Sequence, residues 1–126
     1  MITERIKKIQ NKLDSNEAML ITSDCNRFYF TGFKSSAGTV IITKTNSFLL
    51  IDFRYIEKAK SVVKSSEVLL SQKVDTEIKE ILTNEGVKKL YVETFSLSIS
   101  QFEAYKSTFE GVEVSKPQVS SDTEKK

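Results

Sequence analysis

The sequence of 126 residues contains no histidine, no tryptophan, one cysteine and one proline. Without histidine, the chain cannot form a Ser-His or Cys-His catalytic pair, and it has no imidazole to bind a metal ion. The single Cys25 cannot form an internal disulfide, and we expect it to be an inert, half-buried turn residue of a protein from a reducing compartment. No run of about 18 apolar residues is present, so we expect no membrane-spanning segment and no membrane partner.

The charge of the chain is nearly balanced, with 19 basic and 17 acidic residues and a net charge of +2. Nucleic-acid-binding proteins concentrate basic residues on one face, whereas the lysines here are scattered among acids, so we predict no nucleic-acid partner. The first segment, MITERIKKIQNKL, is amphipathic and lacks the apolar core of a secretion signal. Together these features predict a cytoplasmic protein with one ordinary globular domain.

The apolar periodicity predicts helices and strands that alternate along most of the chain. In the first half it predicts a surface helix, a buried strand, a turn, a short aromatic strand and a hairpin. Their ranges are 2–13, 18–21, 24–26, 28–30, and 38–42 with 48–51. In the second half, helices bearing Ile56, Ile78 and Phe102 alternate with strands. These strands are predicted at 67–70, 90–92 and 112–114.

Several polar residues are placed where they can cap these helices. We expect Asp52 and Asp75 to cap the helices that follow them, because a carboxylate accepts the free N–H groups of the first turn. Ser98 and Gln101 resemble a capping box. The order of elements predicts an α/β domain with a mixed sheet flanked by helices over residues 1–114. Residues 115–126 hold the only proline and one apolar side chain, and we expect a linker or disordered tail.

The same residues offer no catalytic or metal-binding constellation. The loop Lys34–Gly38 lacks the pattern of a phosphate-binding loop. The carboxylates are placed as helix caps and solvated residues, and no segment resembles a calcium-binding loop. We therefore predict no catalytic residue, no metal ligand and no cofactor in this chain.

Three short segments carry a more specific signal when they are read together. They are Asn26-Arg-Phe-Tyr-Phe-Thr-Gly-Phe33, Ser36-Ala-Gly38, and Ile51-Asp-Phe-Arg-Tyr55 with Ala59. This combination resembles the N-terminal domain of the creatinase/prolidase/Xaa-Pro aminopeptidase family, and it is most similar to the bacterial Xaa-Pro aminopeptidases. The resemblance implies a ribonuclease-H-like α/β fold.

The resemblance also implies a larger parent protein, a metal-dependent Xaa-Pro aminopeptidase or dipeptidase. In the family, a C-terminal catalytic domain binds two divalent metal ions, such as manganese, which activate the attacking water. That domain is not part of this sequence, so this chain alone should be inactive. The resemblance gives the N-terminal domain two roles, which are formation of a homo-oligomer and restriction of substrate access. A creatinase-type or dipeptide-specific parent would share this architecture.

Four residues are candidates for positions close to a substrate. Arg54 is the first, since a guanidinium can pair with a carboxylate of a substrate or partner, although an ion pair with Asp52 is an equal alternative. Arg27 is a second candidate, for which a structural role is favoured. Phe33 and Tyr55 complete the set, while two of the aromatic residues at positions 29, 30 and 33 are expected in the core. A second hypothesis is a free-standing peptide- or protein-binding module with the same fold.

Overall fold

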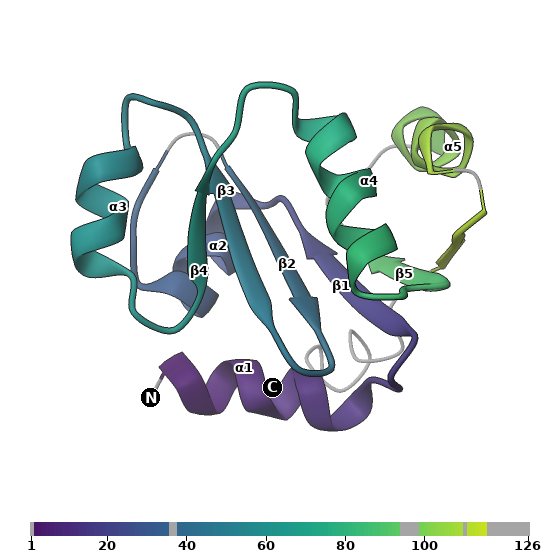
Figure 1. The fold of residues 1–126 in the computed structure, drawn as a ribbon, viewed down its shortest axis with the longest axis horizontal. Coiled ribbons are helices and arrows are strands. Elements are labelled where there is room, and N and C mark those ends of the chain that lie inside the picture. The colour runs from purple at the N-terminus through teal and green to yellow at the C-terminus, as the bar shows by residue number, and fades with distance from the viewer. Residues whose placement is uncertain (1, 36–37, 94–98, 110, 116–126) are drawn as a thin grey trace.

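The structure is a computed structural model, and it describes residues 2–35, 38–93, 99–109 and 111–115. One six-stranded sheet lies between two layers of helices (Figure 1). The helices are α1 (Ile2–Lys12), α2 (Asp24–Thr31), α3 (Ile56–Val62), α4 (Val74–Asn84) and α5 (Ile99–Thr108). The strands are β1 (Glu17–Ile21), β2 (Thr39–Thr43), β3 (Ser47–Ile51), β4 (Glu67–Leu70), β5 (Lys89–Val92) and β6 (Glu113–Ser115).

The sheet is mixed, and its strands follow the order β4-β3-β2-β1-β5-β6. Strand β2 pairs antiparallel with β1 and β3, whereas the remaining neighbours pair in parallel. All strands except β2 therefore run in the same direction. Their carboxyl ends lie at one edge of the sheet, which we call the carboxyl edge. This topology confirms the predicted α/β class with a mixed sheet and flanking helices.

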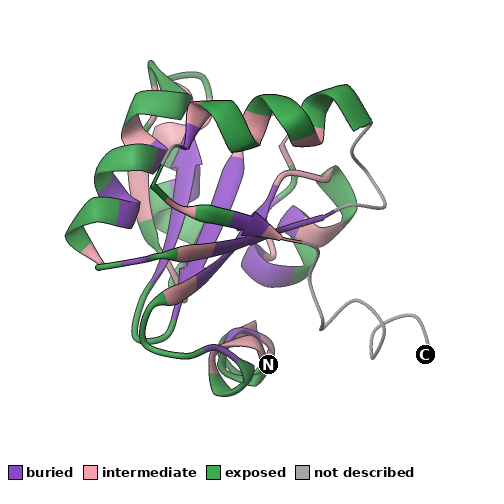
Figure 2. Cartoon of the chain, turned by 90° about the vertical axis from the view of Figure 1, so that its right-hand side faces the viewer, coloured by how far each residue is buried: buried purple, intermediate pink, exposed green. Residues whose placement is uncertain are grey.

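The two faces of the sheet are buried by different helices, because successive side chains of a strand point to opposite sides. In β1, Met19 and Ile21 belong to the core under α1, α2 and α3, while Ala18 and Leu20 belong to the core under α4 and α5. Every residue of β2 and β3 is buried. Figure 2 shows the result, with buried residues concentrated in the strands and exposed residues on the outer surfaces of the helices.

The predicted turn and aromatic strand between Asp24 and Phe30 are wrong, because this segment is the helix α2. The buried residues of this helix lie on one helical face, since Phe30 and Thr31 follow Arg27 by three and four positions. Phe28 and Phe30 alternate as they would in a strand, and this alternation led to the wrong prediction. The hydroxyl oxygen of Ser23 accepts the Asn26 N–H at 3.3 Å and caps the first turn. Cys25, expected to be half-buried in a turn, is therefore exposed on a helix.

The two predicted aspartate caps are also wrong. Asp52 accepts the N–H of Arg54 at 3.0 Å in a turn before α3, and Tyr55 occupies the N-cap position without a side-chain hydrogen bond. At α4, Asp75 lies inside the first turn, and the carboxylate of Glu77 reaches back to the N–H groups that precede the helix.

The other predicted elements are confirmed within a few residues. The predicted cap at Ser98, the motif residues 36–37 and the tail from 116 onward lie outside the described residues.

Candidate functional site

Described parts of the three family-like segments lie at the carboxyl edge of the sheet (Figure 1). The start of α2 follows β1, Gly38 precedes β2, and the turn Asp52–Tyr55 follows β3. Loops at the carboxyl ends of parallel strands are where α/β domains commonly place ligand-binding residues. This edge is therefore the candidate functional site, and each predicted site residue is described in relation to it.

Arg27 is a buried structural residue. Only 4% of its side chain is exposed, and its guanidinium donates to Thr22 O at 2.7 Å, to Asp24 Oδ1 at 2.6 Å and to Ser35 O at 2.8 Å. These bonds join the start of α2 to the loop that leads into β2. Gly38 leaves room for the stem of this side chain, because a Cβ there would lie 3.3 Å from Arg27 Cδ. The favoured structural interpretation of Arg27 agrees with this geometry.

Glu93 is a buried carboxylate at the end of β5, and the sequence interpretation missed it. Its Oε1 accepts the N–H groups of Thr22 and Ser23 at 2.6 and 2.9 Å. Its Oε2 accepts the Ser23 hydroxyl at 2.8 Å and the Asn26 amide at 2.6 Å. Because both oxygens are engaged by donors, Glu93 holds the start of α2 rather than acting as a free base. The sequence did contain one signal for this role of Glu93, which is an acidic residue placed directly after the apolar residues of a buried strand.

Arg54 forms the ion pair that the sequence offered as its alternative role. Its Nη2 lies 2.8 Å from Asp52 Oδ2, and the two side chains are 57% and 28% exposed. The hydrogen bond from this guanidinium holds the pKa of Asp52 below its ordinary value and raises the pKa of Arg54. The guanidinium also lies 5.3 Å from the centre of the Tyr55 ring. The pair is exposed enough for a partner carboxylate to compete with Asp52.

Phe33 and Tyr55 are packed against each other, with ring centres 6.2 Å apart in an edge-to-face arrangement. Phe33 is buried, and Tyr55 is partly exposed. In the structure, Arg54 thus packs on Tyr55, and Tyr55 packs on Phe33. Arg27 is not part of this cluster, because it is buried and supports the adjoining loop through Ser35 O. As expected, two of the three neighbouring aromatic residues are core residues, Phe30 and Phe33, and Tyr29 is exposed.

Apolar side chains are also exposed at this edge. Phe53, in the turn after β3, is 79% exposed; Leu70, at the end of β4, is 45% exposed; and Val74, at the start of α4, is 38% exposed. Phe53 belongs to the family-like motif Ile51–Tyr55. Its exposure was not predicted, because an aromatic residue next to a strand can be either buried or exposed.

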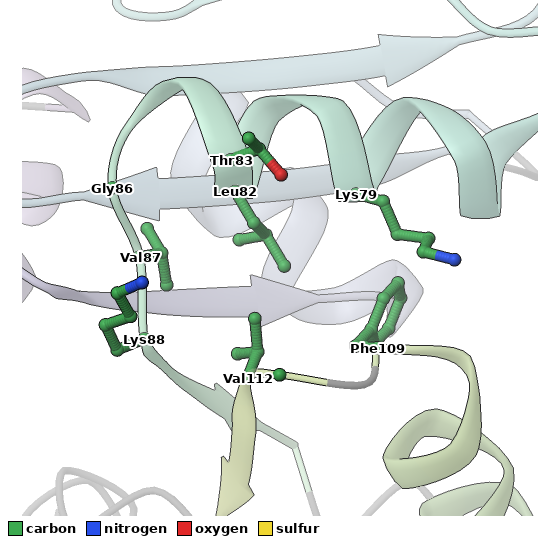
Figure 3. A pocket seen from close by; sticks show the side chains of 9 residues that line it. Lys79, Leu82, Thr83, Gly86, Val87, Lys88, Phe109 and Val112 are labelled. Carbon is green, nitrogen blue, oxygen red and sulfur yellow. The ribbon is translucent and has the colours of Figure 1, made fainter.

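The part of the chain that the structure describes holds no group of three or more His, Cys, Asp or Glu side chains that could bind a metal ion. Across the same residues, no helix is both long and apolar enough to cross a membrane. A hollow of about 200 Å³ lies between α4, the α4–β5 turn and the α5–β6 turn (Figure 3). Leu82, Val87, Phe109 and Val112 are among its lining residues, and none of the predicted site residues is.

Known proteins resemble this chain over nearly its whole length. The family described as Creatinase/Prolidase N-terminal domain matches residues 5–119. The uncharacterized peptidase YqhT of Bacillus subtilis is 31% identical over 120 residues, which cover 90% of this chain and 32% of YqhT. The chain thus spans about a third of the length of this curated relative.

Two solved structures share the fold. The aminopeptidase P, Xaa-Pro aminopeptidase from Streptococcus thermophilus, has a TM-score of 0.82 at 26% identity, with 99% of this chain and 96% of that chain covered. The N-terminal domain of the cytoplasmic peptidase PepQ from Mycobacterium tuberculosis has a TM-score of 0.76 at 23% identity, with 97% and 96% covered. Both solved chains consist almost entirely of this domain, so the domain folds on its own in these proteins. On the family match, the relatives and the fold, this chain belongs to the creatinase/prolidase N-terminal domain family.

Proposed function

We propose that this chain is the non-catalytic N-terminal domain of a metal-dependent Xaa-Pro aminopeptidase or dipeptidase. The observation that carries the proposal is the family match over residues 5–119 in a chain that spans only 32% of YqhT. The remaining two thirds of such a protein would form the C-terminal catalytic domain of the same polypeptide. Two divalent metal ions, such as manganese, would bind there and activate the water that attacks the bond before proline.

In this proposal the domain assists formation of a homo-oligomer and restricts access to the catalytic cleft. The carboxyl edge supports this role, because it offers contact residues rather than reactive groups. Arg54 is half-exposed and can exchange Asp52 for a carboxylate of the substrate or of a neighbouring subunit. Tyr55 lies beside it as a partly exposed aromatic surface. A narrow entrance bounded by such residues would admit a short proline peptide and exclude folded chains.

The proposal also assigns the protein to the cytoplasm. The single cysteine, which is typical of proteins from reducing compartments, supports this assignment. The similar domain of Mycobacterium tuberculosis comes from a peptidase that is called cytoplasmic.

The decisive test is the mass of the native polypeptide in its source cell, detected with an antibody raised against this domain. We expect a species roughly three times the mass of the 14.3 kDa chain, since the chain covers 32% of its relative. That species should cleave an Xaa-Pro peptide when manganese is added. The pure 126-residue chain should not, and metal-dependent cleavage by that chain would contradict the proposal.

A free-standing binding module is the second candidate function, and the 79% exposed side chain of Phe53 favours it over an inert domain. The same mass measurement separates the two functions. A native species of about 14.3 kDa would support the module and would rule out the peptidase domain.

A further inference from the structure

We propose that the outer surface of α2 binds a short acidic peptide segment of another protein. This surface consists of Cys25, Phe28 and Tyr29, and we call these three residues the α2 face. The inference goes beyond the proposed function and does not depend on it, because the same surface would be present on a peptidase domain and on a free-standing module.

The three residues of the α2 face lie next to one another. Cys25 is three positions before Phe28 and four before Tyr29, and residues at these spacings are neighbours on the surface of a helix. Cys25 is exposed, and so are 46% of Phe28 and 45% of Tyr29. The opposite side of α2 carries the buried residues Arg27 and Phe30. The helix therefore has one packed side and one exposed, largely aromatic side.

Each of the two exposed rings has a cation beside it. The guanidinium of Arg5, in α1, lies 4.3 Å from the centre of the Tyr29 ring, and its Nη1 donates to Tyr29 O at 2.8 Å. The ammonium of Lys34 lies 5.9 Å from the centre of the Phe28 ring. A cation that rests on an aromatic ring keeps N–H groups that can donate to a carboxylate.

An aromatic surface with cations at its border fits a partner that combines carboxylates with apolar side chains. Asp24, at the start of α2, does not neutralise the two cations, because it pairs with Arg27 at 2.6 Å. Exposed apolar surface with a polar border is typical of protein-binding sites, and aromatic residues dominate the binding there. Arginine and lysine form charge-assisted hydrogen bonds with carboxylates. Charge complementarity therefore selects an acidic segment.

The size of the α2 face indicates a short segment. From Cys25 to Tyr29 the helix rises only about 6 Å. Two half-exposed rings offer an area on the order of 200 Å², whereas a stable complex of separate proteins buries about 800 Å² on each partner. A second copy of the chain would need a larger surface. We therefore assign the face to a peptide that binds weakly, with a dissociation constant of about 0.1–1 mM.

The thiol of Cys25 provides a direct test, because the sequence has one cysteine and it lies in the α2 face. The measurement is the rate at which N-ethylmaleimide, an uncharged reagent, modifies Cys25 in the 126-residue chain. The probe is the peptide acetyl-Glu-Glu-Leu-Phe-Glu-Glu-amide. At about ten times its dissociation constant it should occupy about 90% of the chain and slow the modification about tenfold.

Two control peptides separate charge from apolar contact. One has glutamine in place of each glutamate, and the other has serine in place of leucine and phenylalanine. At the same concentration, each should change the modification rate by less than about twofold.

Matched variants of the chain locate the binding. Phe28→Ser should weaken binding of the acidic peptide about fivefold, whereas Val62→Ser, which changes an apolar residue of α3 that is also 46% exposed, should leave it unchanged. Lys34→Gln should weaken binding about threefold, and the same change at Lys58, an exposed lysine of α3, should not.

Three results would overturn the proposal. The first is a modification rate that the acidic peptide leaves unchanged, and the second is equal protection by the glutamine peptide. The third is a 126-residue chain that sediments as a dimer at micromolar concentration and becomes monomeric with Phe28→Ser, since the occupant would then be a second copy. None of these results bears on the proposed function, which the mass of the native polypeptide tests.

Discussion

Glu93 accepts two hydrogen bonds from Ser23, one from the backbone N–H at 2.9 Å and one from the hydroxyl at 2.8 Å. Ser23 in turn caps α2, since its hydroxyl oxygen accepts the N–H of Asn26 at 3.3 Å. The pair therefore connects the end of β5 to the first turn of α2. Arg27, one turn into that helix, then supports the loop before β2 through Ser35 O.

Replacement of Glu93 by glutamine should destabilise the domain. Glutamine has the size of glutamate, but its amide group would face the donors of Ser23 and Asn26, so at least one buried donor would lose its acceptor. We expect a loss of about 1–3 kcal/mol in the free energy of unfolding, measured by urea denaturation. Glu80→Gln is the control, because Glu80 is an exposed residue of α4. Equal losses in the two variants would contradict the role of Glu93.

Arg27 should not tolerate lysine, although the charge is kept. Its guanidinium reaches Thr22 O, Asp24 Oδ1 and Ser35 O at once, and an ammonium group on a flexible stem cannot reproduce that planar geometry. We expect Arg27→Lys to reduce the free energy of unfolding by about 2–3 kcal/mol in a urea titration. The same change at the exposed Arg54 is the control, and its urea midpoint should stay at the wild-type value. A normal midpoint for Arg27→Lys would show that the guanidinium contacts are dispensable.

The sequence predicted the fold well where apolar periodicity was clear. The apolar stripe of α1 that includes Ile6 is buried, and so are the apolar residues of β2 and β3. Because the apolar pattern of the sequence reflects these buried surfaces, the predicted and observed elements agree. The prediction for segment 24–30 was wrong because two aromatic residues at alternate positions resemble the pattern of a strand. Its helix depends on a serine cap and on Glu93, which is about 70 residues away in the sequence.

The candidate site was predicted less completely than the fold. The motif containing Arg54 and Tyr55 was found, and its place at the carboxyl edge follows from the strand order. The sequence analysis favoured a structural role for Arg27 and left the two roles of Arg54 equal. Local sequence does not show how deeply an arginine is buried, and the two side chains are 4% and 57% exposed. That difference arises from tertiary contacts, as does the role of Glu93.

Gly32 should be sensitive to alanine for two reasons. Its φ of 72° favours glycine, and a Cβ would lie 2.6 Å from Ile2 Cδ1 in α1. Gly86 has a φ of 70°, and a Cβ at this position would have no atom within 4 Å. Gly86→Ala therefore measures the cost of the backbone conformation alone. We expect Gly86→Ala to cost about 1–2 kcal/mol and Gly32→Ala about 0.5–1 kcal/mol more, by urea denaturation. In the background Ile2→Val, which removes Cδ1, the two costs should become equal, and a persisting difference would exclude this contact.

Glu77 should make the stability of the domain depend on pH. Burial raises the pKa of its carboxyl group, but hydrogen bonds from Gln72 N–H, Ser71 and Lys73 N–H outweigh burial and leave the pKa below the ordinary value of 4.5. Since the folded pKa is depressed, the stabilisation is complete above pH 4.5 and is lost as the pH falls through the folded pKa. Glu77→Gln should therefore lower the urea midpoint at pH 7, and the difference from wild type should shrink towards pH 3. Glu80→Gln should show no such pH dependence, and a constant difference for Glu77→Gln across this range would contradict the assignment.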